Sequence, residues 1–156
     1  MHLMDDQGNP RVQAHAAAAV INFTEKCDKE ILKLYLDGLL SKLLQLLQCN
    51  RKMVQEQAIT AIASVADCAS EHFIRFYDTF MPLLKQILYH ANSKEYRMLR
   101  GKAMECISLI GMAVGKEKFF GDAKEVMDFM VQAQCMYRSI ASVGADWLFS
   151  GSVRVR

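Results

Sequence analysis

Apolar and small residues recur along the chain at the spacing of one helix face, and three segments share the same stripe. The segments align at five positions: Val12/Val54/Leu99, Ala16/Ala58/Ala103, Ala19/Ala61/Cys106, Val20/Ile62/Ile107 and Phe23/Val65/Ile110. Successive positions lie four, three, one and three residues apart, which is one stripe of a helix with 3.6 residues per turn. The second stripe follows the first by 42 residues, and the third follows the second by 45. The pattern predicts three equivalent helices.

Between these helices lie segments of a second kind, richer in leucine and aromatic residues. Residues 31–47 and 73–88 align with an offset of 41, and residues 119–133 keep an apolar face of their own. We call the first kind B helices and the second kind A helices. The predicted B helices cover residues 10–27, 52–69 and 95–114, and the predicted A helices cover residues 30–48, 72–91 and 118–135.

Helix pairs that recur every 40 to 47 residues are the signature of HEAT and armadillo repeats. The predicted fold is therefore all-α: a HEAT-repeat α-solenoid of about three helix pairs that starts with a B helix and ends with an A helix. A closed bundle of four or five helices is the alternative, although it gives no reason for a stripe with a fixed period. The predicted organisation is an N-terminal segment over residues 1–9, repeats over 10–135, and a divergent, disordered tail over 136–156.

Three residues give local predictions. Pro10 suits the first turn of a helix, with Asn9 as its N-cap. Pro82 falls inside an A helix, where it removes one hydrogen bond and is expected to bend the helix. Gly115 is expected to end the third B helix.

Composition narrows the class of protein. Only 2 prolines and 8 glycines in 156 residues argue against barrels and sandwiches, and 52% hydrophobic residues allow a large core. A net charge of +2 supplies no general field for nucleic acid or an anionic membrane, and no uncharged run is long enough for a membrane span. The five cysteines are scattered without a CxxC motif, which is typical of reduced thiols in an intracellular protein.

The sequence contains no arrangement typical of catalysis. Gly111, Gly115 and Lys116 resemble a phosphate-binding loop only faintly, because the spacing is one residue short and no Ser or Thr follows. The four histidines form no HxxxH or HxxE pattern, so no metal site is predicted. We therefore expect no enzymatic activity and no cofactor.

Four strings resemble the importin-β superfamily of nuclear transport receptors, and in particular its karyopherin beta-3 (importin-5-like) branch. They are NPRVQAHAAAA (residues 9–19), IASVAD (62–67), FYDTFMPLLK (76–85) and LRGKAMECISLIGMAVGKEKF (99–119). The similarity covers residues 4–135 and corresponds to a central stretch of a much longer receptor. It stops near Cys135, and the tail that follows resembles an alternative or aberrant end.

The resemblance implies a function in nuclear import. Such receptors hold a cargo protein with a nuclear localisation signal on a face lined by B helices. They also contact the Phe-Gly repeats of nucleoporins in grooves between A helices, and they occupy the cytoplasm, the nucleus and the nuclear pore. They release import cargo when the GTP-bound form of Ran binds. The Ran-binding N-terminal repeats lie outside this similarity, so Ran binding is not predicted for this chain. No nucleic acid or membrane partner is implied.

Five B-helix positions are candidates for facing a partner protein: Gln13, Gln55, Thr60, Arg100 and Ser108. The first exposed position after each stripe anchor holds Gln13, Gln55 or Arg100, and such residues also commonly bond to the loop of a neighbouring repeat. The alternative function is a HEAT-repeat scaffold subunit of a complex that has no role in transport.

Solenoid repeats bury their faces against their neighbours, so an end without a partner exposes an apolar stripe. The first B helix (residues 16–23) and the last A helix (residues 119–131) are each expected to present such a stripe. We therefore predict that the chain self-associates.

Overall fold

The computed structural model describes residues 2–90 and 93–132, which contain helices and no β-strand. Five α-helices are defined: α1 (Pro10–Thr24), α2 (Lys29–Gln48), α3 (Lys52–Ala69), α4 (Tyr77–His90) and α5 (Arg97–Val114). Three short 3₁₀-helices accompany them: η1 (His2–Asp5), η2 (Ser70–Phe76) and η3 (Lys94–Tyr96). Residues 116–132 are helical as well. The predicted tail, 136–156, lies outside the described residues.

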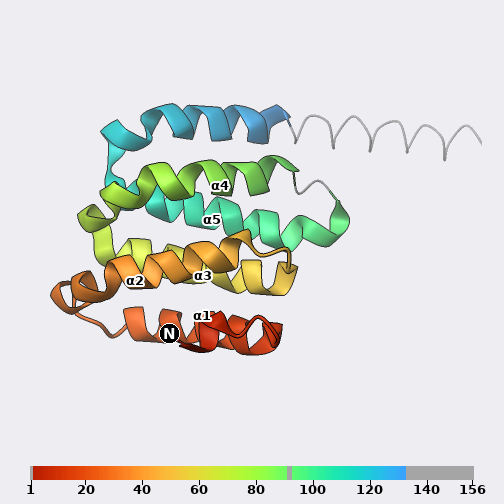
Figure 1. Ribbon diagram of the computed structural model, residues 1–156. Helices are drawn as coiled ribbons and strands as arrows, with labels where there is room; N and C mark the ends of the chain where they lie inside the picture. Colours follow the sequence, from red (N-terminus) through yellow and green to blue (C-terminus); the bar gives the residue numbers. More distant parts are fainter. Residues whose placement is uncertain (1, 91–92, 133–156) are drawn as a thin grey trace, which may run out of the picture. The chain divides into compact units, whose positions relative to one another are not determined.

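The chain divides into two compact units, the first ending at Phe119. In the first unit α1, α3 and α5 lie side by side in one layer, and α3 packs against both of the others (Figure 1). The second layer contains α2 and α4, which pack on α3 and α5 respectively (Figure 1). This is the predicted alternation of B and A helices, and α1 and α5 lie at opposite ends of their row. The HEAT-repeat solenoid is confirmed, and the closed bundle is excluded.

The repeated stripe forms the core where both neighbouring repeats are present. In α3 all five stripe residues are completely buried, including Ala58 and Ala61, whose small side chains allow the neighbouring helices to approach closely. The A helix α2 covers them with a row of leucines, of which Leu36 and Leu43 have no exposed surface. Burying one such leucine stabilises a fold by about 1.5–3 kcal/mol, so this row anchors the stack.

The same stripe is largely open in α1. Ala19 is exposed and Phe23 keeps 46% of its surface accessible, whereas the equivalent residues of α3 are buried. An apolar groove of about 550 Å³ lies here, lined by Leu3, Met4, Ala16, Ala19, Val20, Phe23, Ile31, Tyr35 and Leu39. We call it the α1 groove. The predicted exposure of the first B-helix stripe is confirmed.

The first helix is shorter than predicted. It ends at Thr24 instead of residue 27, because the Thr24 hydroxyl donates to the carbonyl groups of Val20 and Ile21 inside the last turn. The next helix, α2, begins at Lys29, because the Asp28 carboxylate caps it by accepting a hydrogen bond from the backbone N–H of Glu30 at 3.4 Å.

Two other predicted helices begin with a 3₁₀ segment. The A helix predicted over 72–91 is a 3₁₀-helix up to Phe76, and its α-helical part starts at Tyr77. The B helix predicted from residue 95 becomes α-helical only at Arg97. In the first case the tighter winding accompanies the burial of Phe73, whose ring packs against Phe80 with 5.8 Å between centroids. Aromatic packing therefore decides a boundary that periodicity places only approximately.

The local predictions have mixed outcomes. Pro10 occupies the first turn of α1, and Gly115 ends α5 with a positive φ of 86°. Asn9 holds the N-cap position without capping, because its side chain donates to the Asp6 carboxylate at 2.9 Å. Pro82 lies inside α4, close after its start, and deprives the Asp78 carbonyl group of its helical donor. The expected bend of α4 stays a prediction.

Candidate partner-binding surfaces

The B helices present one open face of the first unit. Equivalent positions of α1, α3 and α5 form this surface, which we call the B-layer face. It includes Arg11 and His15 in α1, Met53 and Gln57 in α3, and Met98, Lys102 and Glu105 in α5. Acidic, basic, amide and apolar side chains are mixed on it.

Two of the predicted partner-facing residues bond to the backbone just before their own helices. Gln13 is buried, and its Nε2 donates to the carbonyl oxygen of Met4 at 2.9 Å. Gln55, the equivalent residue of α3, donates from Nε2 to the carbonyl oxygen of Leu47 at 3.0 Å. In each case the amide binds the backbone of the segment that precedes its helix. The buried amide of Gln13 thus satisfies a carbonyl group of its own chain, and a contact of Gln13 with a partner stays a prediction.

The other three candidates differ in their surroundings. Thr60 is half-buried on the B-layer face and accepts a hydrogen bond from the Lys102 ammonium at 2.6 Å. Arg100 is half-buried at the position equivalent to Gln55. Ser108 is exposed, and its hydroxyl donates to the Met104 carbonyl oxygen at 3.1 Å within the same helix. The structure therefore joins Thr60 to Lys102, which the sequence analysis missed, and does not gather the five candidates into one site.

Polar contacts between neighbouring B helices recur on this layer. The hydroxyl groups of Thr24 and Ser64 lie 2.5 Å apart and connect α1 to α3. The contact between Lys102 and Thr60 connects α3 to α5 in the same way. Such contacts fix the rotation of one repeat against the next, and therefore the spacing of the side chains on the B-layer face.

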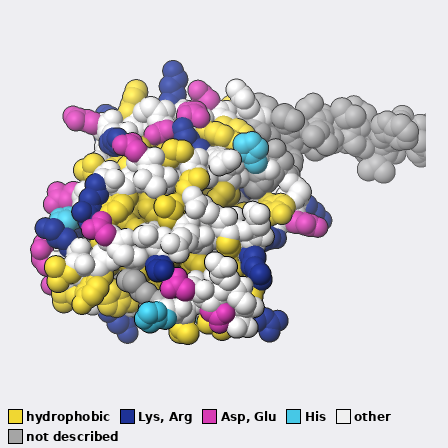
Figure 2. Space-filling view, viewed as in Figure 1, with side chains coloured by type: hydrophobic (Ala, Val, Ile, Leu, Met, Phe, Trp, Pro, Cys, Tyr) yellow, Lys and Arg dark blue, Asp and Glu magenta, His cyan; other side chains and the backbone are white. Residues whose placement is uncertain are grey.

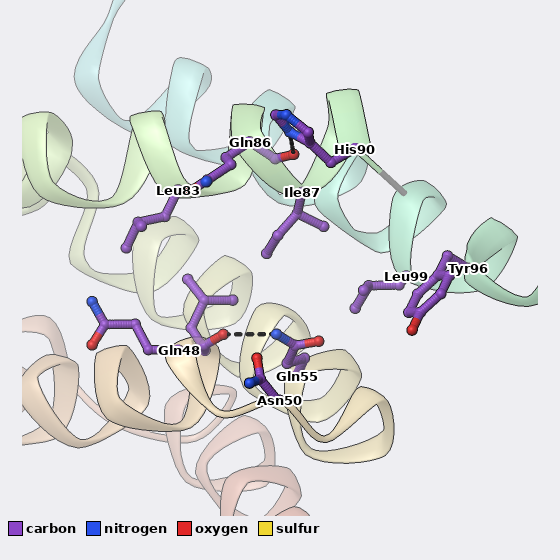
Figure 3. A pocket seen from close by; sticks show the side chains of 10 residues that line it. Gln48, Asn50, Gln55, Leu83, Gln86, Ile87, His90, Tyr96 and Leu99 are labelled. Atoms are coloured by element: carbon purple, nitrogen blue, oxygen red, sulfur yellow. Dashed lines mark hydrogen bonds between the residues drawn. The ribbon is translucent and has the colours of Figure 1, made fainter. Parts of the chain in front are cut away.

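A second candidate surface lies between the two A helices. A groove of about 560 Å³ separates the end of α2 from α4 and reaches the start of α5 (Figure 3). We call it the A-helix groove; its lining residues are Leu47, Gln48, Asn50, Gln55, Leu83, Gln86, Ile87, His90, Tyr96 and Leu99. Leu83 and Ile87 point from α4 toward the end of α2 (Figure 3). In the space-filling view apolar side chains form a band between α2 and α4, and charged side chains gather mainly toward the edge (Figure 2).

The groove combines an apolar floor with an uncharged polar rim. The floor consists of the buried Leu47 and Leu99 and the half-buried Leu83 and Ile87. Gln48, Asn50 and Gln86 are exposed around it. None of the described residues that line it is Asp, Glu, Lys or Arg. Carboxamides both donate and accept hydrogen bonds, so this rim suits the backbone of an extended peptide, and the floor suits an apolar side chain.

The described residues show no group of three or more His, Cys, Asp or Glu that could hold a metal ion. None of the described helices has the length and apolar character needed to cross a membrane.

Comparison with known proteins decides the family. The family model described as "Importin subunit beta-1-like, TPR repeats" matches residues 2–135 of the chain. The chain belongs to the importin-β family. The resemblance of its four strings is thereby confirmed, and the match ends where that resemblance ends.

Two importins show the relationship in detail. The chain is 53% identical to importin subunit beta-3 of Saccharomyces cerevisiae over 124 residues, which are 80% of this chain and 11% of the yeast protein. It is 34% identical to a probable importin-5 homolog of Dictyostelium discoideum over 108 residues, which are 69% of this chain and 10% of the relative. The chain thus spans about a tenth of the length of these relatives.

Solved structures match the fold. Kap121p bound to Pho4p superimposes with a TM-score of 0.78 and 47% identity, over 86% of this chain and 13% of Kap121p. Kap121p bound to Nup53p gives a TM-score of 0.78 and 49% identity over the same shares. The helix pairs of this importin-β family member thus stack as they do in Kap121p.

Sequence reasoning missed most of the A-helix groove. Gln48 is the last residue of α2 and Asn50 lies in the connection after it, whereas Gln86 and His90 lie in α4. Nothing in the sequence joins these segments, although polar residues beside the leucine stripe of an A helix mark its open side. Only the packing of α2 beside α4 brings the rim together.

Proposed function

We propose that this chain is a segment of a nuclear import receptor that binds cargo proteins through its stacked HEAT repeats. The match to Kap121p in complexes with Pho4p and Nup53p supports this proposal most strongly. The expected location is the cytoplasm and the nucleus. The chain acts by binding and carries out no catalysis.

The B-layer face is the proposed contact surface for cargo that carries a nuclear localisation signal. Thr60 and Ser108 remain candidates there, together with Glu105 and Gln57, whereas Arg100 remains a candidate at the position equivalent to Gln55, which lines the A-helix groove. Lys102 is held to Thr60 at 2.6 Å, so its ammonium is partly satisfied before a cargo arrives. Glu105 is exposed on the same helix, and its carboxylate can attract a basic cargo segment.

The A-helix groove is the proposed site for the Phe-Gly repeats of nucleoporins. Its apolar floor at Leu83 and Ile87 accepts a phenylalanine ring, and its carboxamide rim accepts the flexible backbone beside a glycine. An uncharged groove fits these peptides because they present neither a carboxylate nor an ammonium group. The two proposed partners thus bind separate surfaces.

Binding of a basic localisation peptide tests the cargo surface. The 156-residue chain is titrated with the labelled peptide, and Glu105→Lys is compared with Ser41→Lys, an exposed position on α2. Glu105→Lys is expected to weaken binding about threefold to tenfold, because it replaces an attraction by a repulsion. Ser41→Lys is expected to leave binding almost unchanged. Equal affinities for both variants would exclude the B-layer face as the cargo surface.

A Phe-Gly peptide and its Ser-Gly counterpart test the groove. The unchanged chain is expected to bind the first peptide and not the second. Ile87→Gln should reduce binding at least threefold, because it removes part of the apolar floor. Met112→Gln changes an exposed apolar residue outside the groove and serves as the control. Circular dichroism confirms that both variants are folded. Failure of the folded chain to bind both cargo and Phe-Gly peptides would contradict the proposed function.

A further inference from the structure

Two cysteines from successive repeats meet at one edge of the first unit. Cys27 lies in the connection between α1 and α2, and Cys68 lies in the last turn of α3, 41 residues later. The Cys68 thiol donates to the carbonyl oxygen of Cys27, with 3.7 Å between sulfur and oxygen. Both residues are half-buried. The Cys68 sulfur thus lies against the backbone of Cys27, whose own thiol donates to the Asp28 carbonyl oxygen at 3.4 Å.

Contacts outside the cysteines hold the two segments together. The Lys29 ammonium donates to the Ser70 hydroxyl at 3.1 Å, which joins the start of α2 to the end of α3. The hydroxyl groups of Thr24 and Ser64, 2.5 Å apart, make a second connection on the side of α1. The backbone positions of Cys27 and Cys68 are therefore fixed by neighbours that remain when the thiols react. A disulfide needs Cα atoms about 4.4–6.8 Å apart, and contacts that hold the two segments together help to keep the cysteines within reach of each other.

The electrostatic surroundings keep the Cys68 thiol protonated. Burial is the main cause that raises the pKa of the Cys68 thiol, and the neighbouring Cys27 raises it further. Asp67 and Asp28 act in the same direction, whereas the Lys29 ammonium opposes them. Two thiolates side by side repel each other, and a disulfide carries no charge. Stepwise thiol exchange needs only one thiolate at a time, so this repulsion does not prevent it.

We propose that Cys27 and Cys68 are a redox site. The two residues form a reversible intramolecular disulfide when a small disulfide, such as oxidised glutathione, oxidises them. The thiolate of one cysteine attacks the small disulfide, forms a mixed disulfide and releases one thiolate of glutathione. The thiolate of the second cysteine then attacks the protein sulfur and releases the other glutathione. The protein loses two protons and two electrons, and one molecule of oxidised glutathione becomes two of reduced glutathione.

The disulfide would join two repeats through a covalent bond at their edge. It would hold the connection between α1 and α2 against the end of α3. The rotation of α1 against α3 sets the spacing of the B-layer face, so the redox state would restrain that spacing. This inference does not depend on the proposed transport function.

The other described cysteines offer no comparable pair. Cys106 is completely buried, and burial strongly raises the pKa of its thiol. Cys49 lies at the opposite end of α2, where its thiol contacts the Arg51 carbonyl oxygen at 4.0 Å. Cys135 lies outside the described residues. Mapping of the disulfide-linked peptides can therefore distinguish a bond between Cys27 and Cys68 from other pairings.

The test incubates the whole chain with mixtures of oxidised and reduced glutathione, followed by alkylation, proteolysis and mass spectrometry. The expected product is a monomer lighter by two hydrogen atoms, with a peptide that links Cys27 to Cys68. The rate should rise with pH, because the raised pKa of the Cys68 thiol keeps it protonated at neutral pH. Reduced glutathione in excess should restore both thiols.

Serine variants supply the controls. Cys27→Ser and Cys68→Ser should each abolish the intramolecular disulfide, whereas Cys49→Ser should form it at an unchanged rate. Circular dichroism shows whether each variant is folded. The inference is overturned if the folded wild-type chain keeps both thiols free in oxidised glutathione. It is also overturned if Cys27 and Cys68 are found only in intermolecular or mixed disulfides, or if another pair forms first.

Discussion

At the scale of single residues, the position just after each of the first two stripe anchors has a structural task. Gln13 and Gln55 are equivalent in the repeat, and each donates its side-chain amide to a backbone carbonyl group in the segment before its helix. A polar residue beside an apolar stripe can face either a partner or its own chain. The residue type alone does not distinguish these two roles. Both glutamine amides lie within hydrogen-bond distance of a carbonyl oxygen, which shows that they bond to their own chain.

Replacing Gln13 with alanine should therefore lower stability. The change removes a buried hydrogen bond and leaves the Met4 carbonyl group without its donor, at a cost of about 1–2 kcal/mol. Ser108→Ala is the control, because Ser108 is exposed and its hydroxyl bonds only within its own helix, so its effect should stay within about 0.5 kcal/mol. Urea unfolding followed by circular dichroism measures both. Equal losses would show that the amide of Gln13 has no special role.

Cys106 gives a second prediction at this scale. Burial raises the pKa of its thiol far above the usual value, so the thiol stays protonated and shielded across the neutral range. In the folded chain Cys106 should react with iodoacetamide much more slowly than Cys49, and the two rates should become similar in denaturant. Mass spectrometry of timed samples measures the rates. Rapid labelling of Cys106 in the folded chain would contradict its burial.

At the scale of elements, two glycines in one helix have opposite roles. A Cβ atom added at Gly111 would lie 2.4 Å from the ring of Phe119, so the missing side chain lets the next helix start against α5. A Cβ atom at Gly101 would meet nothing within 4 Å. The sequence shows only two glycines inside a helical segment, and glycine generally weakens helices.

Alanine at these two positions should change stability in opposite directions. Gly111→Ala should cost about 1–3 kcal/mol, because Phe119 or α5 must move to remove the overlap. Gly101→Ala should stabilise the chain by about 0.5–1 kcal/mol through helix propensity alone. Thermal unfolding by circular dichroism compares the two. A stabilising Gly111→Ala would show that the ring of Phe119 does not rest on that glycine.

At the scale of the whole molecule, the α1 groove distinguishes the first repeat from the second. Its residues include Phe23 and Tyr35, both about half exposed, whereas the equivalent stripe of α3 is covered by α2. Open apolar surfaces of this kind are sites of association. The chain should therefore self-associate as its concentration rises.

Phe23→Lys tests this origin of self-association. The lysine places a charge in the α1 groove, near the end of α1 where a cation also suits the helix dipole. Met112→Lys makes the same change near the end of α5, outside the groove. Sedimentation velocity over a range of concentrations should show less association for Phe23→Lys and no change for Met112→Lys. A monodisperse, monomeric wild-type chain at high concentration would contradict the prediction.

The sequence by itself determined the repeat, because a helix that packs on one side must place apolar residues every three or four positions. It also determined the alternation of A and B helices, and the long string at residues 99–119 pointed to the family. The sequence determined the helix ends less well. The end of α1 and the start of α4 differ from the predicted residues, where the Thr24 hydroxyl bonds to the backbone and the rings of Phe73 and Phe80 pack together.

Only the tertiary structure decided which polar residues are available to a partner. Gln13 and Ser108 are similar in a helical pattern, yet one is buried on a carbonyl group and the other is exposed. The A-helix groove and the pair of Cys27 and Cys68 each join residues about 40 positions apart. Local periodicity records which face of a helix is buried. It does not record which side chains of neighbouring repeats meet, because the register between stacked helices is fixed by packing in three dimensions.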